Sequence, residues 1–305
     1  MMIEEKIQLT AIIPIRSMVG KLDNLRITLR SCAGLPIQIV IVHDDASDGT
    51  EEDLNQLLED FDDLNIVKLQ VQCESPGLAR NLGIKLAKAD WICFWDSDDL
   101  PNPTAYFSLL NSINLECYDV LIGAIATQSG FDLLTQKTHT FSVTGDSLQM
   151  QLANMPAFTR MMFRKVLIGE HLFPAFKIGE DQCFLRKIEF LNARVFYSEE
   201  LLYVYISDFD GQLSRRKNLA SELALTLEFL AGELDNSPLQ MQIFCQAQFL
   251  KIFISSCRNE GWIQTLLASP KAFRAAIKLV LRHPRTATKI FFFLAQNRPQ
   301  LAGRE

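Results

Sequence analysis

The chain has 305 residues, of which 48% are hydrophobic and 22% charged, proportions that are ordinary for a globular protein with a substantial core. Its seven cysteines form no Cys-x-x-Cys pair and its four histidines are dispersed, so neither a disulfide framework nor a zinc site is indicated. A net charge of −6 makes nucleic acid a poor partner, no apolar run is long enough to span a bilayer, and acidic residues near the N-terminus do not fit a signal peptide, so we expect a cytoplasmic protein.

The first half of the chain alternates between two patterns. Short apolar runs rich in Ile and Val, typical of buried strands, occupy 9–15, 37–43, 66–71, 91–95 and 118–126. Segments with helical spacing lie between them at 22–32, 51–61 and 78–88. This alternation predicts an α/β fold, with a mostly parallel sheet covered by helices on both faces. The more mixed stretch 127–163 is expected to include an antiparallel return.

The pattern changes near residue 218. Beyond it, four segments have helical spacing and prolines separate them: 223–234, 239–257, 262–267 and 273–281. We therefore predict two parts, an α/β domain over 1–217 and a helical C-terminal extension over 218–305.

Two acidic clusters stand where predicted elements begin or end. Asp96-Ser97-Asp98-Asp99 follows the apolar run that ends at Trp95, and ligands of parallel sheets bind beyond the carboxyl ends of the strands. Crowded carboxylates repel one another unless a cation neutralises them, and hard divalent ions that do so also bind diphosphates. The second cluster, Glu180-Asp181, opens a helical pattern and could simply favour a helix N-terminus. Together they suggest a metal–diphosphate site facing a general base.

Five motifs in order give the chain a resemblance to a known family. They are Thr10-Ala11-Ile12-Ile13-Pro14, His43-Asp44-Asp45-Ala46-Ser47-Asp48-Gly49-Thr50, Ser75-Pro76-Gly77-Leu78-Ala79-Arg80-Asn81-Leu82-Gly83, Asp96-Ser97-Asp98-Asp99 and Gly179-Glu180-Asp181. Over about residues 8 to 216 the sequence resembles the family 2 glycosyltransferases of bacterial, non-processive type. The resemblance implies the GT-A fold, a nucleotide-diphospho-sugar transferase architecture.

The resemblance implies a set of nucleotide contacts. The residue matching Asp45 accepts the imide N–H of a uracil ring, and Pro14 ends the strand beside it. Arg80 would reach the base or the phosphates, and Arg215 would serve the phosphates. The alternatives are that Asp45 belongs to a turn and helix cap, and that Arg80 and Arg215 are solvated.

The acidic clusters match the family's catalytic motifs. Asp98 corresponds to the chief ligand of Mn²⁺ or Mg²⁺, Asp96 to a ligand or its neighbour, and Asp99 to a group beside the sugar or metal. Such an ion would bridge the donor phosphates and stabilise the departing nucleoside diphosphate. Asp181 matches the base that deprotonates the acceptor hydroxyl during inverting transfer.

The resemblance therefore implies an inverting, metal-dependent enzyme that moves one sugar from a nucleotide-sugar, expected to be a UDP-sugar. The acceptor is expected to be a glycan or a lipid-linked molecule. The alternative is a non-catalytic member of the same fold that binds a nucleotide-sugar or a partner enzyme.

The C-terminal segment is basic within an acidic chain. Residues 271–305 contain eight Lys and Arg against one Glu, a balance of +7, which leaves −13 for the remainder. In this segment Phe273, Ile277, Val280 and Leu281 recur at helical spacing between cations. A basic helix with an apolar side can lie in a membrane interface, or the same side can pack on the catalytic domain. We predict peripheral contact of 271–295 with the inner face of the membrane.

Overall fold

A computed structural model describes residues 6–18, 22–44, 49–129, 137–139, 158–207 and 219–296. The chain divides into two compact units. The α/β unit comprises Met1–Phe141, Phe158–Ala175 and Ala193–Gln212, and the helical unit comprises Ser142–Ala157, Phe176–Asn192 and Leu213–Glu305. Residues 176–192 thus group with the C-terminal helices. The predicted boundary at residue 217 stays a prediction.

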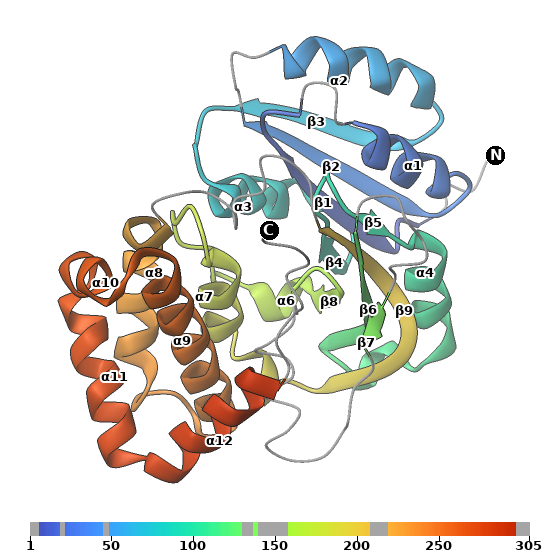
Figure 1. The fold of residues 1–305 in the computed structure, drawn as a ribbon. Coiled ribbons are helices and arrows are strands. Elements are labelled where there is room, and N and C mark those ends of the chain that lie inside the picture. The colour runs from blue at the N-terminus through green and yellow to red at the C-terminus, as the bar shows by residue number, and fades with distance from the viewer. Residues whose placement is uncertain are drawn as a thin grey trace. The chain divides into compact units, whose positions relative to one another are not determined.

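The α/β unit is built on one mixed sheet (Figure 1), which has nine strands over the described residues. The strands are β1 (Leu9–Ile15), β2 (Ile37–Asp44), β3 (Asn65–Val71), β4 (Trp91–Phe94), β5 (Leu100–Pro101), β6 (Val120–Ser129), β7 (Lys137–His139), β8 (Met161–Arg164) and β9 (Val195–Ser207). Their order is β3-β2-β1-β4-β8-β6-β9-β5, and β7 pairs with β6. β1 to β4 run parallel, as predicted.

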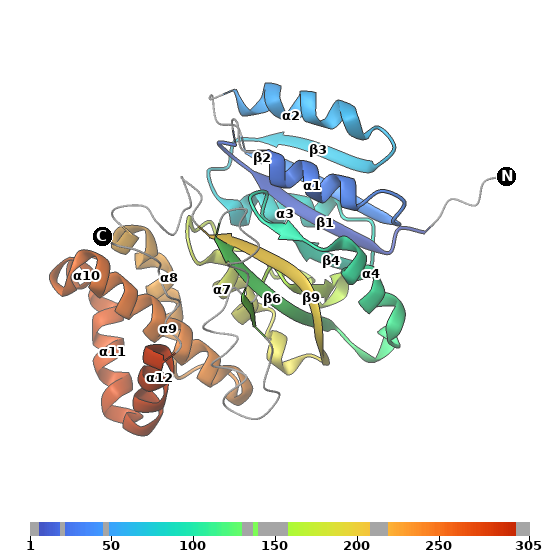
Figure 2. The same ribbon diagram turned by 45° about the vertical axis from the view of Figure 1, so that its right-hand side comes forward.

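Helices cover both faces of this sheet. They are α1 (Asp23–Ser31), α2 (Thr50–Leu58), α3 (Pro76–Leu86), α4 (Pro103–Ser112) and α6 (Lys165–Ile168), with 3-10 turns η1 (Glu59–Phe61) and η2 (Leu115–Cys117). Right-handed crossovers place α1 and α2 on one face and α3 on the other (Figure 2). Ser75 caps α3 by accepting the Leu78 N–H, and Pro76 occupies its first turn.

The second half of the sheet contains the predicted strand β6, the predicted antiparallel return, and β9, which was not predicted. β8 is the antiparallel return, pairing with β4 and β6. β9 runs parallel to β6 along most of its 13 residues and places Tyr203 beside Ile125. The register shifts between Ile122 and Ala124, so β9 bends as it crosses the sheet.

The helical unit contains α7 (Glu180–Lys187), η4 (Phe190–Asn192), α8 (Leu219–Glu233), α9 (Leu239–Glu260), α10 (Trp262–Ala268), α11 (Pro270–Arg282) and α12 (Pro284–Gln296). The four predicted C-terminal helices are confirmed, and α12 is additional. α8 and α9 pack on each other, and Leu227, Leu230, Phe244 and Phe249 of these helices are buried. No helix among the described residues is long and apolar enough to cross a membrane.

Candidate active site

The parallel strands bring several predicted residues to one edge of the sheet. Pro14 lies near the carboxyl end of β1, opposite Val42 of β2. It is partly exposed, whereas its neighbours along β1 are buried. The acidic loop 96–99 follows β4, which pairs with β1, and is anchored where the Trp95 N–H donates to the Ile12 carbonyl at 3.0 Å. This edge is the position predicted for the ligand.

Asp99 faces the protein interior. It is 1% exposed, and its carboxylate accepts the Tyr203 hydroxyl at 2.8 Å and the Ile206 N–H at 2.8 Å. Burial raises the pKa of Asp99 well above its usual value, as do the charges of Asp98 and Asp96, while both hydrogen bonds oppose the shift. Direct contact of Asp99 with a sugar or metal stays a prediction, but these bonds favour a positioning role.

Tyr203 connects this carboxylate to the start of the acidic loop. Burial raises the pKa of Tyr203 well above its usual value, so the hydroxyl stays protonated and donates a hydrogen bond to Asp99. The same oxygen accepts the Asp96 N–H at 3.1 Å. One side chain of β9 therefore fixes both ends of the Asp96–Asp99 turn.

Arg80 holds the Asp96 side chain. Its Nη2 donates to Asp96 Oδ1 at 2.8 Å, and the Arg80 side chain is only 6% exposed. Its guanidinium carbon lies 5.2 Å and 5.7 Å from the ring centroids of Phe158 and Phe173. The alternative of a solvated Arg80 does not hold in this structure, and Arg80 places a buried positive charge at the acidic loop.

Asp98 is held through its backbone. Asn24 of α1 donates from Nδ2 to the Asp98 carbonyl at 2.5 Å, while the Asp98 side chain is partly exposed. A fixed backbone with an accessible carboxylate is suited to binding a ligand at the sheet edge.

Asp44, the last residue of β2, is held by contacts with other residues of the protein. It accepts the Cys73 N–H at 2.8 Å and lies 3.4 Å from Arg16 Nη1. These contacts tie the end of β2 to the segment before α3. Asp45, the predicted uracil contact, lies outside the described residues, as does Arg215.

The acidic loop has side chains suited to bind Mg²⁺ or Mn²⁺ when a substrate supplies some of the ligands of the ion. Asp96 and Asp98 offer hard carboxylate oxygens, and such ions commonly bind one or two carboxylates plus phosphate oxygens. In the part of the chain that the structure describes, no group of three or more His, Cys, Asp and Glu side chains could hold a metal ion. The residues fit an ion whose remaining ligands come from a diphosphate and water.

The predicted base lies in the helical unit. α7 follows its N-cap residue Gly179, whose φ of 79° is left-handed, and carries Glu180 and Asp181 in its first turn. Asp181 is partly exposed and accepts the Gln182 side-chain amide at 2.8 Å. Glu180 is buried. The first turn thus presents Asp181 more openly than its neighbour.

Helices α8 and α9 support this turn. The Thr226 hydroxyl of α8 donates to the Ile178 carbonyl at 2.5 Å, and a Cβ added at Gly179 would lie 2.6 Å from Thr226 Cγ2. Burial lowers the pKa of Lys251 on α9 to about 8, and the charge of Asp181 opposes that shift. Neither Tyr203 nor Thr226 was identified from the sequence, because their partners are distant along the chain.

Comparison with known proteins identifies the family. The model of glycosyl transferase family 2 matches residues 10–177. Over 181 residues, 57% of this chain, the sequence is 25% identical to a poly(ribitol-phosphate) β-glucosyltransferase of Bacillus spizizenii, of which it covers only 28%. It is 26% identical over 262 residues to TarP of Staphylococcus aureus, a poly(ribitol-phosphate) β-N-acetylglucosaminyltransferase, covering 82% of this chain and 79% of TarP.

A solved structure gives the same fold. Residues 1–349 of S. aureus TarS, in complex with UDP-GlcNAc, match with a TM-score of 0.64 and 20% identity, over 95% of this chain and 92% of that one. At this identity the likeness concerns the fold, which is the predicted GT-A fold with a helical C-terminal region. Because the family model spans more than half of the 305 residues, the chain belongs to glycosyl transferase family 2.

Proposed function

We propose that the protein is an inverting glycosyltransferase that moves a single sugar from a UDP-sugar to a glycan acceptor. The observation that carries the proposal is the acidic loop at the sheet edge, where Arg80 and Tyr203 hold Asp96 and Asn24 holds the backbone of Asp98. A glucosyltransferase and an N-acetylglucosaminyltransferase among its relatives, and a TarS structure with UDP-GlcNAc, support a hexose or N-acetylhexosamine donor.

The donor would be held at the acidic loop. Asp98 is the proposed principal ligand of Mn²⁺ or Mg²⁺, with Asp96 beside it. Such an ion, when bound, would neutralise charge on the departing diphosphate. Arg80 keeps Asp96 oriented through the bond at 2.8 Å. Pro14 and Asp45 are the proposed contacts of the base, and Arg215 that of the phosphates.

Asp181 is the proposed general base. Inversion requires the acceptor oxygen to attack the anomeric carbon from the face opposite the leaving phosphate, and a carboxylate removes the proton of that hydroxyl. The partial exposure of Asp181, compared with buried Glu180, supports this assignment.

The acceptor is proposed to be an anionic polyol-phosphate polymer or a lipid-linked glycan. Two relatives are named for poly(ribitol-phosphate), a polymer made in repeating phosphodiester units. We further propose that the enzyme works in the cytoplasm, at the inner face of the membrane.

Release of nucleoside diphosphate tests the function. The full chain is incubated with UDP-, GDP- and dTDP-sugars and poly(ribitol-phosphate), with Mn²⁺ or with EDTA. We expect release from one UDP-sugar, with Mn²⁺ and acceptor both required. Binding of a UDP-sugar without turnover under any condition would support the non-catalytic alternative and refute the proposal.

A further inference from the structure

Exposed apolar side chains are concentrated in the last three helices. Of the twelve large hydrophobic residues that are exposed in the described chain, eight lie in α10, α11 and α12. They include Trp262, Leu281 and Phe292, which are 60%, 75% and 59% exposed. Scattered apolar residues are normal on a surface, whereas exposed apolar side chains gathered on helices that contact one another, as α10, α11 and α12 do, favour an interaction site.

α11 has three distinct faces. Ala272, Ala276 and Leu279 are buried where the helix packs on its neighbours, including α8 and α10. At 100° per residue, Ile277, Val280 and Leu281 fall on a second face, about 130° around the helix. This second face is exposed, whereas Phe273, the remaining residue of the apolar side predicted from the sequence, is half-buried and packs against Phe253 of α9.

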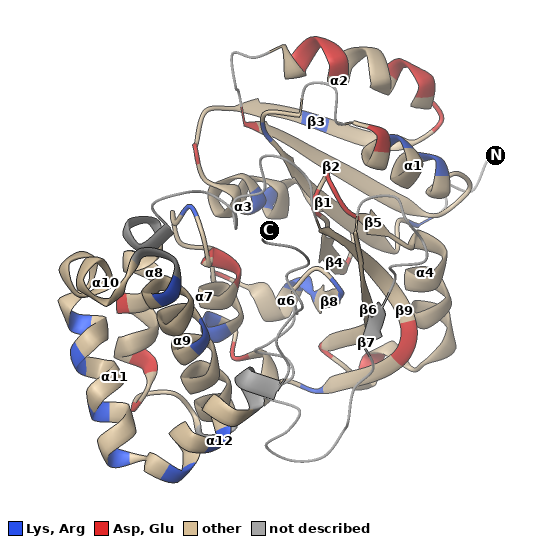
Figure 3. Ribbon diagram, viewed as in Figure 1, with Lys and Arg blue, Asp and Glu red and all other residues tan. Residues whose placement is uncertain are grey.

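The third face of α11 is basic and borders the apolar one. Arg274, Lys278 and Arg282 recur every four residues, and Figure 3 shows basic positions continuing from α11 onto α12. Residues 261–296 contain six Lys and Arg and no acid.

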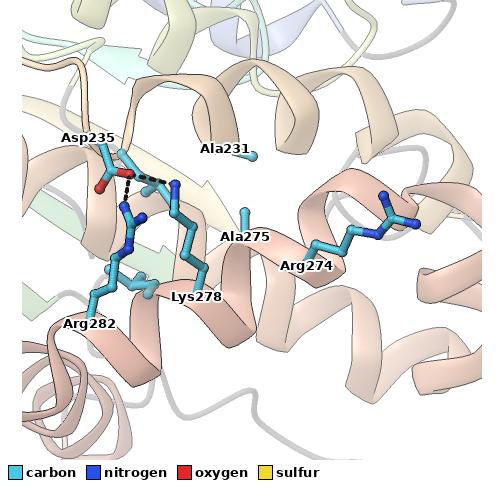
Figure 4. Close-up of a pocket in the computed structure, with 8 residues that line it drawn as sticks. Ala231, Asp235, Arg274, Ala275, Lys278 and Arg282 are labelled. Atoms are coloured by element: carbon cyan, nitrogen blue, oxygen red, sulfur yellow. Dashed lines mark hydrogen bonds and ion pairs between the residues drawn. The ribbon is translucent and has the colours of Figure 1, made fainter.

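Only part of this charge is neutralised within the protein. Lys278 and Arg282 both contact Asp235 at 2.9 Å, at a depression of about 200 Å³, as Figure 4 shows. Among the described residues, Arg274 has no ion pair, and in Figure 4 its guanidinium lies away from Asp235. Arg285 likewise has no ion pair with any described residue. Uncompensated cations therefore adjoin exposed apolar side chains.

We propose that the exposed apolar side of α10–α12 and its bordering cations dock on an anionic lipid bilayer. Apolar side chains enter the headgroup boundary while Arg and Lys contact lipid phosphates, which is how interfacial helices bind. A soluble polyanion would match the cations but would leave Leu281 and Phe292 in water. The proposal extends the proposed function, since a lipid-linked acceptor would lie at such a surface.

Vesicle co-sedimentation of the full chain tests this without any transfer reaction. Vesicles of phosphatidylcholine alone are compared with vesicles that also contain phosphatidylglycerol. We expect binding to the anionic vesicles at low salt, and roughly tenfold weaker binding for Leu281→Asp and for Arg274→Glu. Val166→Asp is the matched control, because Val166 lies on α6 in the other unit and is 78% exposed.

Three outcomes would overturn the proposal. Equally negligible binding to both vesicle types at low salt would refute the proposed membrane contact. Binding of inorganic polyphosphate without vesicle binding would assign the cations to a soluble polyanion. Self-association that Leu281→Asp abolishes, again without vesicle binding, would mean that a second copy covers this face. None of these three outcomes depends on nucleoside diphosphate release. Failure of the membrane proposal and failure of the proposed function are therefore distinguishable.

Discussion

Replacing Tyr203 by phenylalanine removes one oxygen atom at the centre of the acidic loop. That oxygen donates to Asp99 at 2.8 Å and accepts the Asp96 N–H at 3.1 Å. The ring stays in place, so the change creates almost no cavity. It leaves a buried carboxylate with one hydrogen bond fewer and a backbone N–H without its partner.

The size of the effect follows from these two losses. A hydrogen bond to a charged group contributes about 1.5–3 kcal/mol, and an unsatisfied buried donor costs about 1–3 kcal/mol. Because the two losses share one atom and the loop can relax, we expect about 2–4 kcal/mol in total. That corresponds to a melting temperature lower by about 4–15 °C in a domain of this size. A loosened loop should also weaken donor affinity in Mn²⁺ by about tenfold.

Tyr118→Phe is the matched control. The Tyr118 ring packs against Phe196 with centroids 5.1 Å apart, and its hydroxyl has no hydrogen bond to a described residue. The melting temperature from differential scanning fluorimetry and the UDP affinity from calorimetry should therefore be close to wild type for this variant. If Tyr203→Phe matched Tyr118→Phe in both measurements, the argument that Tyr203 holds the loop would be refuted.

Four further changes test other parts of the site. Asp98→Ala should abolish the gain in UDP affinity that Mn²⁺ gives while leaving the fold intact; calorimetry showing the same gain as wild type would contradict the metal assignment. Asp181→Asn should keep donor binding but lose transfer by about 10²-fold or more, and near-normal turnover would place the base elsewhere. Gly179→Ala should destabilise the protein by about 1–3 kcal/mol, because φ is 79° and the new Cβ would lie 2.6 Å from Thr226 Cγ2; an unchanged urea midpoint would contradict this. Burial lowers the pKa of Lys251 to about 8 in the folded state, below its unfolded value. Between these two pKa values the unfolded state binds more protons than the folded state, so wild type should gain stability relative to Lys251→Met as pH rises from 8 towards 10. Urea unfolding with a constant difference across this range would show that Lys251 is not so perturbed.

The parallel strands could be predicted because their sequences carry one unambiguous signal. β2 is buried at every position, and a strand buried on both faces reads as a continuous Ile and Val run. β9 lacks this signal: most of its residues are partly exposed, and it contains Glu199 and Glu200. Its place in the sheet is set by pairing with β6, about 75 residues earlier in the chain, a relation that no local pattern encodes.

The acidic loop could be located for a similar reason, whereas its supports could not. A carboxylate cluster after a buried strand is a local feature. The contact between Tyr203 and Asp96 spans 107 residues, and that between Arg80 and Asp96 depends on how α3 packs on the sheet. Asp99 was grouped with the ligand-binding acids because composition does not distinguish an inward carboxylate from an outward one. Only the packing of β9 makes that distinction.

The placement of α7 changes how the C-terminal helices should be understood. Sequence pattern alone presented them as an appendage beginning at residue 218, separate from the residues that resemble the catalytic domain. In the structure, the turn that carries Asp181 is held by Thr226 of α8, and α7 also packs on α9. The close approach of Gly179 to Thr226 leaves no room for a side chain at position 179. The requirement for glycine in the Gly179-Glu180-Asp181 motif is therefore set by a helix of the C-terminal extension. If Asp181 is the base, the helices that follow residue 218 are part of the catalytic apparatus, because they determine where its carboxylate stands.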